Sequence, residues 1–340
     1  MYGFYRISAC VPRLKIADVR FNVEEIQHLA EKASAAGGSV ILFPELAVTG
    51  YSCADLFHNS ALLDQAEKGI AELAETLPGN AVYAIGAPVR FRGRLFNAAV
   101  VMQNGSILGV VPKINLPNYR EFYEKRYFSS GRGIEAEVFP FAGFDKVPFG
   151  GDLIFEVSPE LRIGIEICED MWAVVPPSSR LALNGATLIL NLSASNELVG
   201  KADYRRELVR GQSARCVAAY AYVSAGVHES TTDTVCGGHA VIAENGALLL
   251  DSERFFRDGR LFQTDVDLQR IGAARLSDSP YANSVEMAPP SDCRRIPVSP
   301  VPQPSDLLRT VEPHPFVPSD TAVRDSRCRE IFSIQSAGLA

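Results

Sequence analysis

Several features of membrane, secreted and nucleic-acid-binding proteins are missing from this sequence. No stretch reaches the roughly 18 uninterrupted apolar residues that a spanning helix needs. The first residues lack the positive segment and long apolar run of a secretory signal. Acidic residues outnumber Lys and Arg, 40 against 33, so the net charge of −7 supplies no basic surface for nucleic acid. We therefore expect a cytoplasmic protein that binds neither membranes nor nucleic acid.

Paired cysteines are also missing. The seven cysteines are an odd number, widely scattered, and none belongs to a C-x-x-C motif. This pattern argues against a disulfide framework or a zinc cluster and favours reduced thiols. The five histidines show no metal-ligand spacing either. A cysteine of this kind is usually a small buried hydrophobic residue, so its position must show whether it reacts.

Apolar residues make up 47% of the chain, and their spacing predicts alternating strands and helices. Residues 4–11 predict a strand, residues 22–36 an amphipathic helix, and the short apolar run at 39–45 a strand that is covered on both faces. The same order recurs in the second half, where buried strands alternate with helices near 176–185 and 203–219. These patterns predict an α/β fold.

Two hairpins indicate an internal duplication. AVVMQNGSIL, from Ala99, aligns without gaps with AVIAENGALL, from Ala240, and each contains the Asn-Gly pair of a tight turn. Since the order of strands and helices around the hairpins also matches, we expect two related halves within one α-β-β-α domain covering residues 1–275.

The composition changes beyond that domain. Ten of the 21 prolines fall between residues 279 and 320, where we expect no helix or strand. We interpret residues 276–340 as an extended Pro-rich arm or linker. The last residues, from Asp325, have the pattern of an amphipathic helix.

Three reactive residues follow predicted strands. Glu45 lies in ILFPELAVTGY, Lys113 in ILGVVPKINLPNY and Cys168 in RIGIEICEDMW. Ligands gather at the carboxyl ends of strands in α/β sheets. Taken singly, the acid fits a loop or helix cap, the lysine fits the surface, and the cysteine fits the core as well as a nucleophile. Together they are the groups that amide hydrolysis by cysteine requires: a thiol, a proton acceptor, and a cation for the oxyanion.

These segments resemble a known family. FPELAVTGY, VVPKINLPNY and GIEICEDMW are similar, in order and spacing, to the three catalytic segments of the nitrilase superfamily of carbon-nitrogen hydrolases, which carry a Glu-Lys-Cys triad on an α-β-β-α sandwich. The resemblance implies that Glu45 is the general base, Lys113 the oxyanion-stabilising cation and Cys168 the nucleophile. By the same match Glu124 is the second acid beside the lysine.

Further segments are similar to one branch of the superfamily. NLSASNELVGKADYRRELV and AGVHESTTDTVCGGHAVIAENG resemble the glutaminase domain of glutamine-dependent NAD⁺ synthetases. The resemblance implies L-glutamine as substrate and a glutamyl thioester on Cys168. It also implies a homo-oligomer and a glutamine pocket made by these residues: Tyr51, Tyr119, Glu169, Trp172, Ser195 and Lys201. Lys201 stands where some relatives have arginine, and an ammonium holds a carboxylate without bidentate geometry.

The synthetase half of such enzymes has no counterpart in the sequence. The glycine-rich SGGxDS-like loop that would cradle phosphates does not occur in these 340 residues. We expect the glutaminase reaction to need no cofactor, and ATP and Mg²⁺ to belong to a synthetase domain, covalent or separate. Two alternatives are an amidase acting on another small amide, and a weakly active domain that serves assembly when isolated.

Two further groups of charged residues have structural interpretations. We expect Asp170 to fix the turn after Cys168, and the backbone N–H of Glu169 to face the oxyanion. The basic cluster of Arg205, Arg206 and Arg210 is interpreted as a salt-bridged face of one helix beside Glu207.

Overall fold

The computed structural model describes residues 3–287, 293–311, 314, 317 and 320–339. The remaining parts of the predicted Pro-rich arm, among them 288–292 and 318–319, lie outside the described residues. The chain forms two compact units, Met1–Asp306 and Leu307–Ala340. The second unit contains helix α8 (Thr321–Leu339), where the sequence predicts an amphipathic helix.

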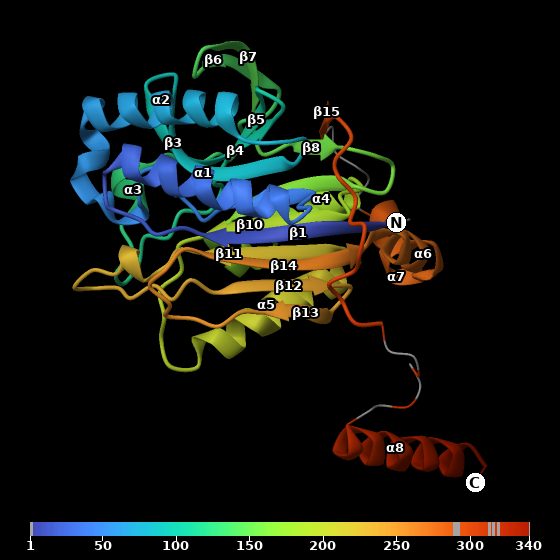
Figure 1. The fold of residues 1–340 in the computed structure, drawn as a ribbon. Coiled ribbons are helices and arrows are strands. Elements are labelled where there is room, and N and C mark those ends of the chain that lie inside the picture. The colour runs from blue at the N-terminus through green and yellow to red at the C-terminus, as the bar shows by residue number, and fades with distance from the viewer. Residues whose placement is uncertain (1–2, 288–292, 312–313, 315–316, 318–319, 340) are drawn as a thin grey trace. The chain divides into compact units, whose positions relative to one another are not determined.

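An eight-stranded sheet forms the first half of the large unit. Its strand order is β14-β1-β2-β3-β4-β5-β7-β6. The bounds are β1 (Phe4–Val11), β2 (Val40–Leu42), β3 (Val82–Phe91), β4 (Arg94–Gln103), β5 (Ser106–Pro112), β6 (Glu137–Phe141), β7 (Phe144–Phe149) and β14 (Arg260–Asp267). Strands β1, β2 and β3 are parallel, and β3, β4 and β5 form antiparallel hairpins. Helices α1 (Val19–Ala35) and α2 (Ser60–Thr76) cover its outer face (Figure 1).

A seven-stranded sheet forms the second half, in the order β13-β12-β11-β10-β9-β8-β15. Its strands are β8 (Leu153–Glu156), β9 (Arg162–Ile167), β10 (Leu188–Ser193), β11 (Ala219–Ser224), β12 (Ala240–Glu244), β13 (Ala247–Asp251) and β15 (Arg294–Pro297). Helices α4 (Pro177–Leu183) and α5 (Lys201–Arg215) pack on its outer face. Among the described residues, no helix combines the length and apolarity that a membrane span requires.

The two sheets pack face to face, and their inner side chains form one apolar core. Ile7 and Val101 from the first sheet belong to the same buried cluster as Ile165 and Leu190 from the second. The alternate residues of the strands face the helices, as Cys10 does in the cluster that includes α1 and α2. Because the strands are covered on both sides, they have continuous apolar runs. The predicted α-β-β-α sandwich is confirmed.

The internal duplication is visible in the backbone. Asn104-Gly105 and Asn245-Gly246 close the β4-β5 and β12-β13 hairpins, and all four residues have positive φ. Each hairpin also changes register at the same place in the aligned sequences, between Val101 and Met102 in the first and between Ile242 and Ala243 in the second. A shared irregularity at equivalent positions supports two related halves more strongly than the sequence match does.

The expectation of no helix or strand between 279 and 320 was wrong. Helix α7 (Ser279–Met287) follows α6 (Leu268–Ser277), and β15 pairs in parallel with β8. Strand β15 is held by a side-chain contact rather than by an apolar pattern. The Arg294 guanidinium donates to the Asp152 carboxylate at 2.6 and 2.8 Å. A four-residue edge strand secured by one buried carboxylate has no local apolar signature, and its terminal proline is tolerated at an edge.

The chain after β15 forms a strap over both sheets. The Ser299 N–H donates to Gln103 of β4 at 2.9 Å, and the Ser39 hydroxyl donates to the Pro302 carbonyl at 2.6 Å. Arg6 of β1 donates to the Asp306 carbonyl at 2.7 Å. Residues 298–306 are therefore bonded to the sandwich in the large unit.

Candidate active site

The three proposed catalytic residues converge at the ends of strands from both sheets. Glu45 follows β2, Lys113 follows β5, and Cys168 begins the short 3₁₀ helix η2 (Cys168–Trp172) after β9. The parallel strands end on the left of the molecule in Figure 1. There the Lys113 Nζ lies 2.6 Å from Glu45 Oε1, and all three side chains are buried.

Three donors fix the position of the Glu45 side chain. Its Oε1 accepts from Lys113 and from Asn97 Nδ2, each at 2.6 Å. Its Oε2 accepts from the backbone N–H of Ala194 at 2.8 Å, just after β10 of the other sheet. Hydrogen bonds to a charged acceptor are the strong ones, so this carboxylate has a fixed position between the two sheets.

Lys113 lies between two acids. Its Nζ is 2.5 Å from Glu124 Oε1, at the first residue of helix α3 (Glu124–Tyr127). Burial disfavours the Lys113 ammonium, but Glu124 and Glu45 outweigh burial and raise its pKa well above the usual value. Burial raises the pKa of Glu124 to about 7, although Lys113 opposes that shift. The lysine therefore remains a cation.

Cys168 has an unusual backbone and a protonated thiol. Its φ is 44°, in the left-handed region that non-glycine residues seldom adopt and that recurs at functional sites. Burial, with a contribution from Glu45, raises the pKa of its thiol to about 12, while Lys113 lowers it. The resting residue is thus a thiol, and attack requires a base to take its proton.

Asp170 fixes the turn after Cys168, as predicted. Its carboxylate accepts from the N–H of Ile167 at 3.0 Å and from the N–H of Asn115 at 2.7 Å. The second bond comes from the loop that carries Lys113. One buried carboxylate therefore ties the nucleophile's turn to the lysine's loop.

The residues of the predicted glutamine pocket lie around this centre in separate small groups. The Tyr51 hydroxyl donates to Glu124 at 2.9 Å, and the Tyr119 hydroxyl donates to Glu169 at 3.0 Å. Lys201 Nζ lies 5.2 Å from the centre of the Trp172 ring. Burial lowers the pKa of Lys201.

The Glu169 carboxyl interacts with residues from several of these groups. Burial raises the pKa of its carboxyl, and Tyr119, Lys113 and Lys201 oppose that shift. Ser195 follows β10, and its backbone N–H donates to the Ser224 hydroxyl at 3.0 Å.

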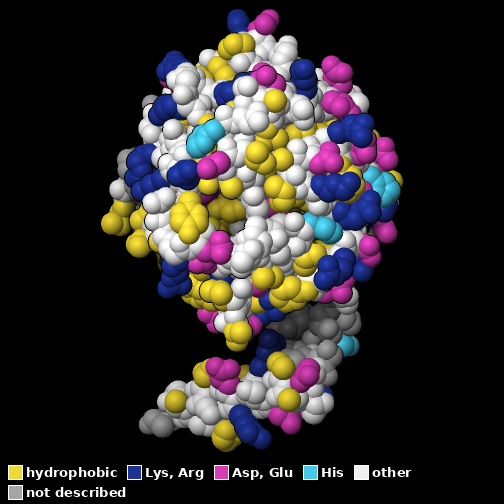
Figure 2. Space-filling model, turned by 90° about the vertical axis from the view of Figure 1, so that its left-hand side faces the viewer, with side chains coloured by type: hydrophobic (Ala, Val, Ile, Leu, Met, Phe, Trp, Pro, Cys, Tyr) yellow, Lys and Arg dark blue, Asp and Glu magenta, His cyan; other side chains and the backbone are white. Residues whose placement is uncertain are grey.

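On the face where the parallel strands end, hydrophobic side chains surround a hollow (Figure 2). In the part of the chain that the structure describes, no three His, Cys, Asp or Glu side chains are arranged to hold a metal ion.

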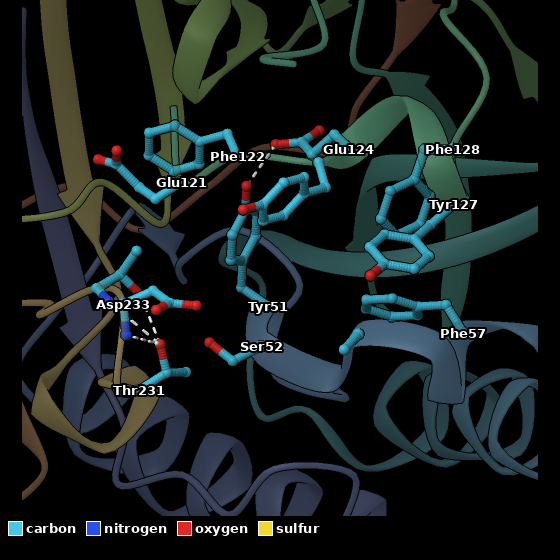
Figure 3. Close-up of a pocket in the computed structure, with 13 residues that line it drawn as sticks. Tyr51, Ser52, Phe57, Glu121, Phe122, Glu124, Tyr127, Phe128, Thr231 and Asp233 are labelled. Carbon is cyan, nitrogen blue, oxygen red and sulfur yellow. Dashed lines mark hydrogen bonds between the residues drawn. The ribbon is translucent and has the colours of Figure 1, made fainter. Parts of the chain in front are cut away.

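A cavity of about 270 Å³ borders the Tyr51–Glu124 hydrogen bond (Figure 3). Aromatic side chains of Phe57 and Tyr127 line one side of it, and Thr231 and Asp233 lie on another. Glu124 lines this cavity, and its partner Lys113 does not. The cavity is therefore an aromatic, partly acidic space that borders the second acid.

Three residues with direct contacts in the site were not predicted. Asn97 of β4 bonds both Glu45 and, at 3.4 Å, Glu124. Its signal in the sequence is a single amide inside an apolar strand. Glu229 is buried and accepts from the N–H of Tyr51 at 2.6 Å, which orients the 3₁₀ helix η1 (Tyr51–His58).

The third is Arg205, which forms a salt bridge, as expected of the basic cluster on this helix, but lies inside the protein. It is fully buried and bonded to Glu197, whereas Arg206 forms the exposed ion pairs with Asp203 and Asp251. The physical reason is helical spacing, because Ala202 and Val209 lie on the buried face of α5 at i−3 and i+4 from Arg205. That apolar register was the available signal.

Comparisons with known proteins agree with this geometry. The family model for carbon-nitrogen hydrolases matches residues 6–276. A glutamine-dependent NAD⁺ synthetase of Mycobacterium bovis is 42% identical over 99% of this chain and 50% of its own length, and that of Mycobacterium leprae is 40% identical with the same coverage. The chain thus spans about half the length of the curated relatives it matches.

Solved structures show the same fold. A glutamine-dependent NAD⁺ synthetase from Cytophaga hutchinsonii has a TM-score of 0.70 and 30% identity, covering 77% of this chain and 43% of that one. A carbon-nitrogen hydrolase from Helicobacter pylori has a TM-score of 0.64 and 19% identity, covering 83% and 95%, and supports the fold alone. The predicted kinship with nitrilase-type enzymes is confirmed: the chain belongs to the carbon-nitrogen hydrolase family.

Proposed function

We propose that this chain is a glutamine amidohydrolase, which releases ammonia from L-glutamine through a thioester on Cys168. The observation that carries the proposal is the arrangement of Lys113, bonded to both Glu45 and Glu124 at the strand ends where the Cys168 thiol lies. A buried thiol, a hydrogen-bonded carboxylate and a fixed cation are the parts that amide hydrolysis by cysteine needs.

In the acylation step, the Cys168 sulfur attacks the side-chain amide carbon of glutamine while its proton passes to Glu45. The oxyanion that forms is stabilised by the Lys113 ammonium and by the backbone N–H of Glu169. Glu45 then returns the proton to the amide nitrogen, the C–N bond breaks, and ammonia leaves a glutamyl thioester. Glu124 holds Lys113 throughout but exchanges no proton with the substrate.

In the deacylation step, water replaces ammonia as the attacking partner. Glu45 accepts a proton from the water, whose oxygen adds to the thioester carbon, and the second oxyanion faces the same two donors. Collapse breaks the C–S bond and returns the proton to sulfur, so glutamate leaves and the enzyme is restored. No cofactor takes part in either step.

Tyr119, Glu169, Trp172, Ser195 and Lys201 are proposed to bind glutamine, with Tyr51 supporting the second acid. The names of the relatives support an assignment to NAD⁺ synthesis. Ammonia would then serve the ATP- and Mg²⁺-dependent amidation of deamido-NAD⁺ by a synthetase module, covalent or separate. We also propose that the protein is cytoplasmic and homo-oligomeric.

The decisive experiment measures ammonia release from glutamine by the chain and by Cys168→Ala. The proposal expects turnover in the first and none in the second. A screen of other ω-amides and carbamoyl compounds tests glutamine as the preferred substrate. A rate equal to that of Cys168→Ala would contradict glutaminase activity in this chain and favour an assembly role.

A second experiment tests the nucleophile directly. A glutamine analogue with an electrophilic diazo-ketone should add its mass to Cys168, as read by peptide mass spectrometry. Glu45→Gln keeps the shape of the side chain but removes the base, so it should bind glutamine and fail to turn it over. Labelling at Cys53 or Cys236 instead, or normal turnover by Glu45→Gln, would overturn the assignment.

A further inference from the structure

Arg205 places a buried positive charge behind the loop that follows β10. Its guanidinium is fully buried and donates to Glu197 Oε1 at 2.9 Å. The other terminal nitrogen lies 3.4 Å from both Ser195 Oγ and the Asn196 carbonyl. Burying a charge costs free energy unless partners satisfy it. An apolar side chain would fit the buried face of α5 at this position, which suggests a function for the Arg205 charge.

His239 is held in one tautomer by this contact. Arg205 Nη1 lies 2.9 Å from His239 Nδ1, and an arginine can only donate, so Nδ1 is the acceptor. The proton is then on Nε2, which donates to Asp251 at 2.7 Å. Burial lowers the pKa of His239, although Asp251 opposes the shift. The neutral His239 imidazole therefore accepts from the Arg205 guanidinium and helps to orient it.

The loop that Arg205 holds carries several contacts of the site. The Ala194 N–H donates to Glu45 at 2.8 Å, and Asn196 accepts a hydrogen bond from Lys201 Nζ through its side-chain oxygen. The amide nitrogen of Asn196 donates to Glu121, so the orientation of its amide is fixed. Because Arg205 bonds the backbone carbonyl of Asn196, it fixes the main chain of the residue whose side-chain oxygen accepts from Lys201.

Charge is also distributed unevenly around the pocket. Arg205 and Lys201 lie close enough that Arg205 contributes to the lowered pKa of Lys201, after burial. Glu169, beside Tyr119, provides negative charge within the influence of Lys201. Arg205 is paired with Glu197, whereas Lys201 bonds the neutral amide of Asn196, so Lys201 is the cation that suits an anionic group of the substrate away from its amide.

We propose that Arg205 is a positioning residue that fixes Ser195, Asn196 and thereby Lys201, and so makes the site selective for amides that bear a carboxylate. The inference rests on the proposed amidohydrolase function but concerns binding rather than bond breaking. It predicts that loss of the guanidinium weakens recognition of the carboxylate end of the substrate and leaves the chemistry at Cys168 intact.

The test compares two ligands and two variants in steady-state kinetics. For Arg205→Met, KM for glutamine should rise about tenfold or more, the effect expected when a charge-assisted contact is lost, while kcat falls less. For 4-aminobutyramide, which lacks the α-carboxylate, kcat/KM should hardly change. Arg210→Met is the matched control, because Arg210 is exposed on α5 and bonds the Gly246 carbonyl rather than this arrangement, so it should behave as wild type. Equal losses for both amides would overturn the proposal.

His239 provides a second test if Arg205→Met fails to fold, as judged by circular dichroism. His239→Gln can accept from Arg205 and donate to Asp251, so it should keep the low KM. His239→Leu cannot, and should show the same selective loss as the arginine variant. If both histidine variants keep wild-type selectivity, Arg205 does not act through this arrangement.

Binding separates the inference from the proposed function. In Cys168→Ala no turnover occurs, and calorimetry measures the Kd for glutamine directly. Adding Arg205→Met to this variant should raise the Kd for glutamine and leave the Kd for 4-aminobutyramide unchanged, even if the wild-type chain releases no ammonia. An unchanged Kd for glutamine, or no binding of glutamine at all, would overturn the role of Arg205.

Discussion

Gly86 lies directly against the peptide unit that carries Glu45. A Cβ atom at Gly86 would stand 2.3 Å from the Leu46 nitrogen and 2.7 Å from the Glu45 carbonyl carbon. Both contacts are far shorter than van der Waals distance and both involve backbone, which cannot swing aside. The absence of a side chain on β3 at this point therefore allows the Glu45 peptide to lie where the proposed catalytic carboxylate reaches between the two sheets.

Gly86→Ala should displace the Glu45 loop. We expect ammonia release to fall at least about tenfold and the free energy of unfolding to fall by about 1–3 kcal/mol, the usual cost of overpacking. Ammonia assays and urea denaturation measure the two effects. Gly211→Ala is the control, since a Cβ atom there meets nothing within 4 Å. Wild-type activity in Gly86→Ala would show that the loop has another stable position.

Asn97→Asp should inactivate the site without changing its shape. The amide of Asn97 donates to Glu45 at 2.6 Å, and an aspartate would set a third carboxylate beside Glu45 and Glu124. Mutual repulsion should raise the pKa of one of these acids and disturb the base, so we expect a loss of about 100-fold or more in kcat. Asn59→Asp, at the exposed N-cap of α2, is the control. Full activity in Asn97→Asp would exclude a positioning role for Asn97.

The free energy of unfolding should decrease as pH rises, because the buried Glu166 carboxyl keeps its proton in the folded protein. Burial raises the pKa of Glu166 from 4.5 to about 7, against bonds from Tyr220 and Ser178. Between these values the unfolded chain loses its proton and the folded chain keeps it, so rising pH favours unfolding by roughly 3 kcal/mol at most. Below pH 4.5 both states are protonated, and above the folded value the loss is complete.

Glu166→Gln cannot ionise and should flatten this dependence. Urea denaturation at pH 5 and pH 7.5 should show a smaller difference in the free energy of unfolding than in wild type. Some dependence should remain, because burial also raises the pKa of Glu229 to about 7. Glu75→Gln, on the exposed face of α2, should leave the wild-type difference unchanged. An unaltered slope in Glu166→Gln would mean that Glu166 is ionised when folded.

The resting Cys168 should absorb as a thiol at neutral pH. With a pKa of about 12, set by burial and Glu45 and opposed by Lys113, the thiolate should appear only in strongly alkaline solution. The difference in ultraviolet absorbance between wild type and Cys168→Ala measures it as pH is raised. A thiolate signal already present at pH 7 would contradict proton transfer to Glu45 during attack and favour a preformed ion pair with Lys113.

The sandwich and the three catalytic candidates could be predicted because their signals are local. Apolar runs mark the buried strands, and Glu45, Lys113 and Cys168 stand immediately after such runs. Parallel strands bring their carboxyl ends to one side, so residues distant in sequence meet without any further information. The Asn-Gly turns likewise marked the repeated hairpins.

The contacts that complete the site could not be predicted because each depends on a partner far along the chain. Asn97 gives no local sign that Glu45 lies across from it, and the basic cluster around Arg205 gives no sign that Arg205 bonds Ser195 and Asn196. Strand β15 exists because Asp152 accepts Arg294, not because of its own composition. For Asn97 and Arg205, the available signal in the sequence is a polar residue at a position where the pattern expects an apolar one.

The pairing of β1 with β14 has a consequence for biosynthesis. Phe4 pairs with Asp267, Val11 pairs with Arg260, and Arg6 bonds both Asp265 and the Asp306 carbonyl. Translation delivers β1 long before its neighbour β14, so the first strand lacks this edge partner until residues 260–267 have been synthesised. Contacts of such long sequence separation form slowly. The first sheet, which supports β2 and the Glu45 loop through β1, can therefore be completed only after the chain has been synthesised through β14.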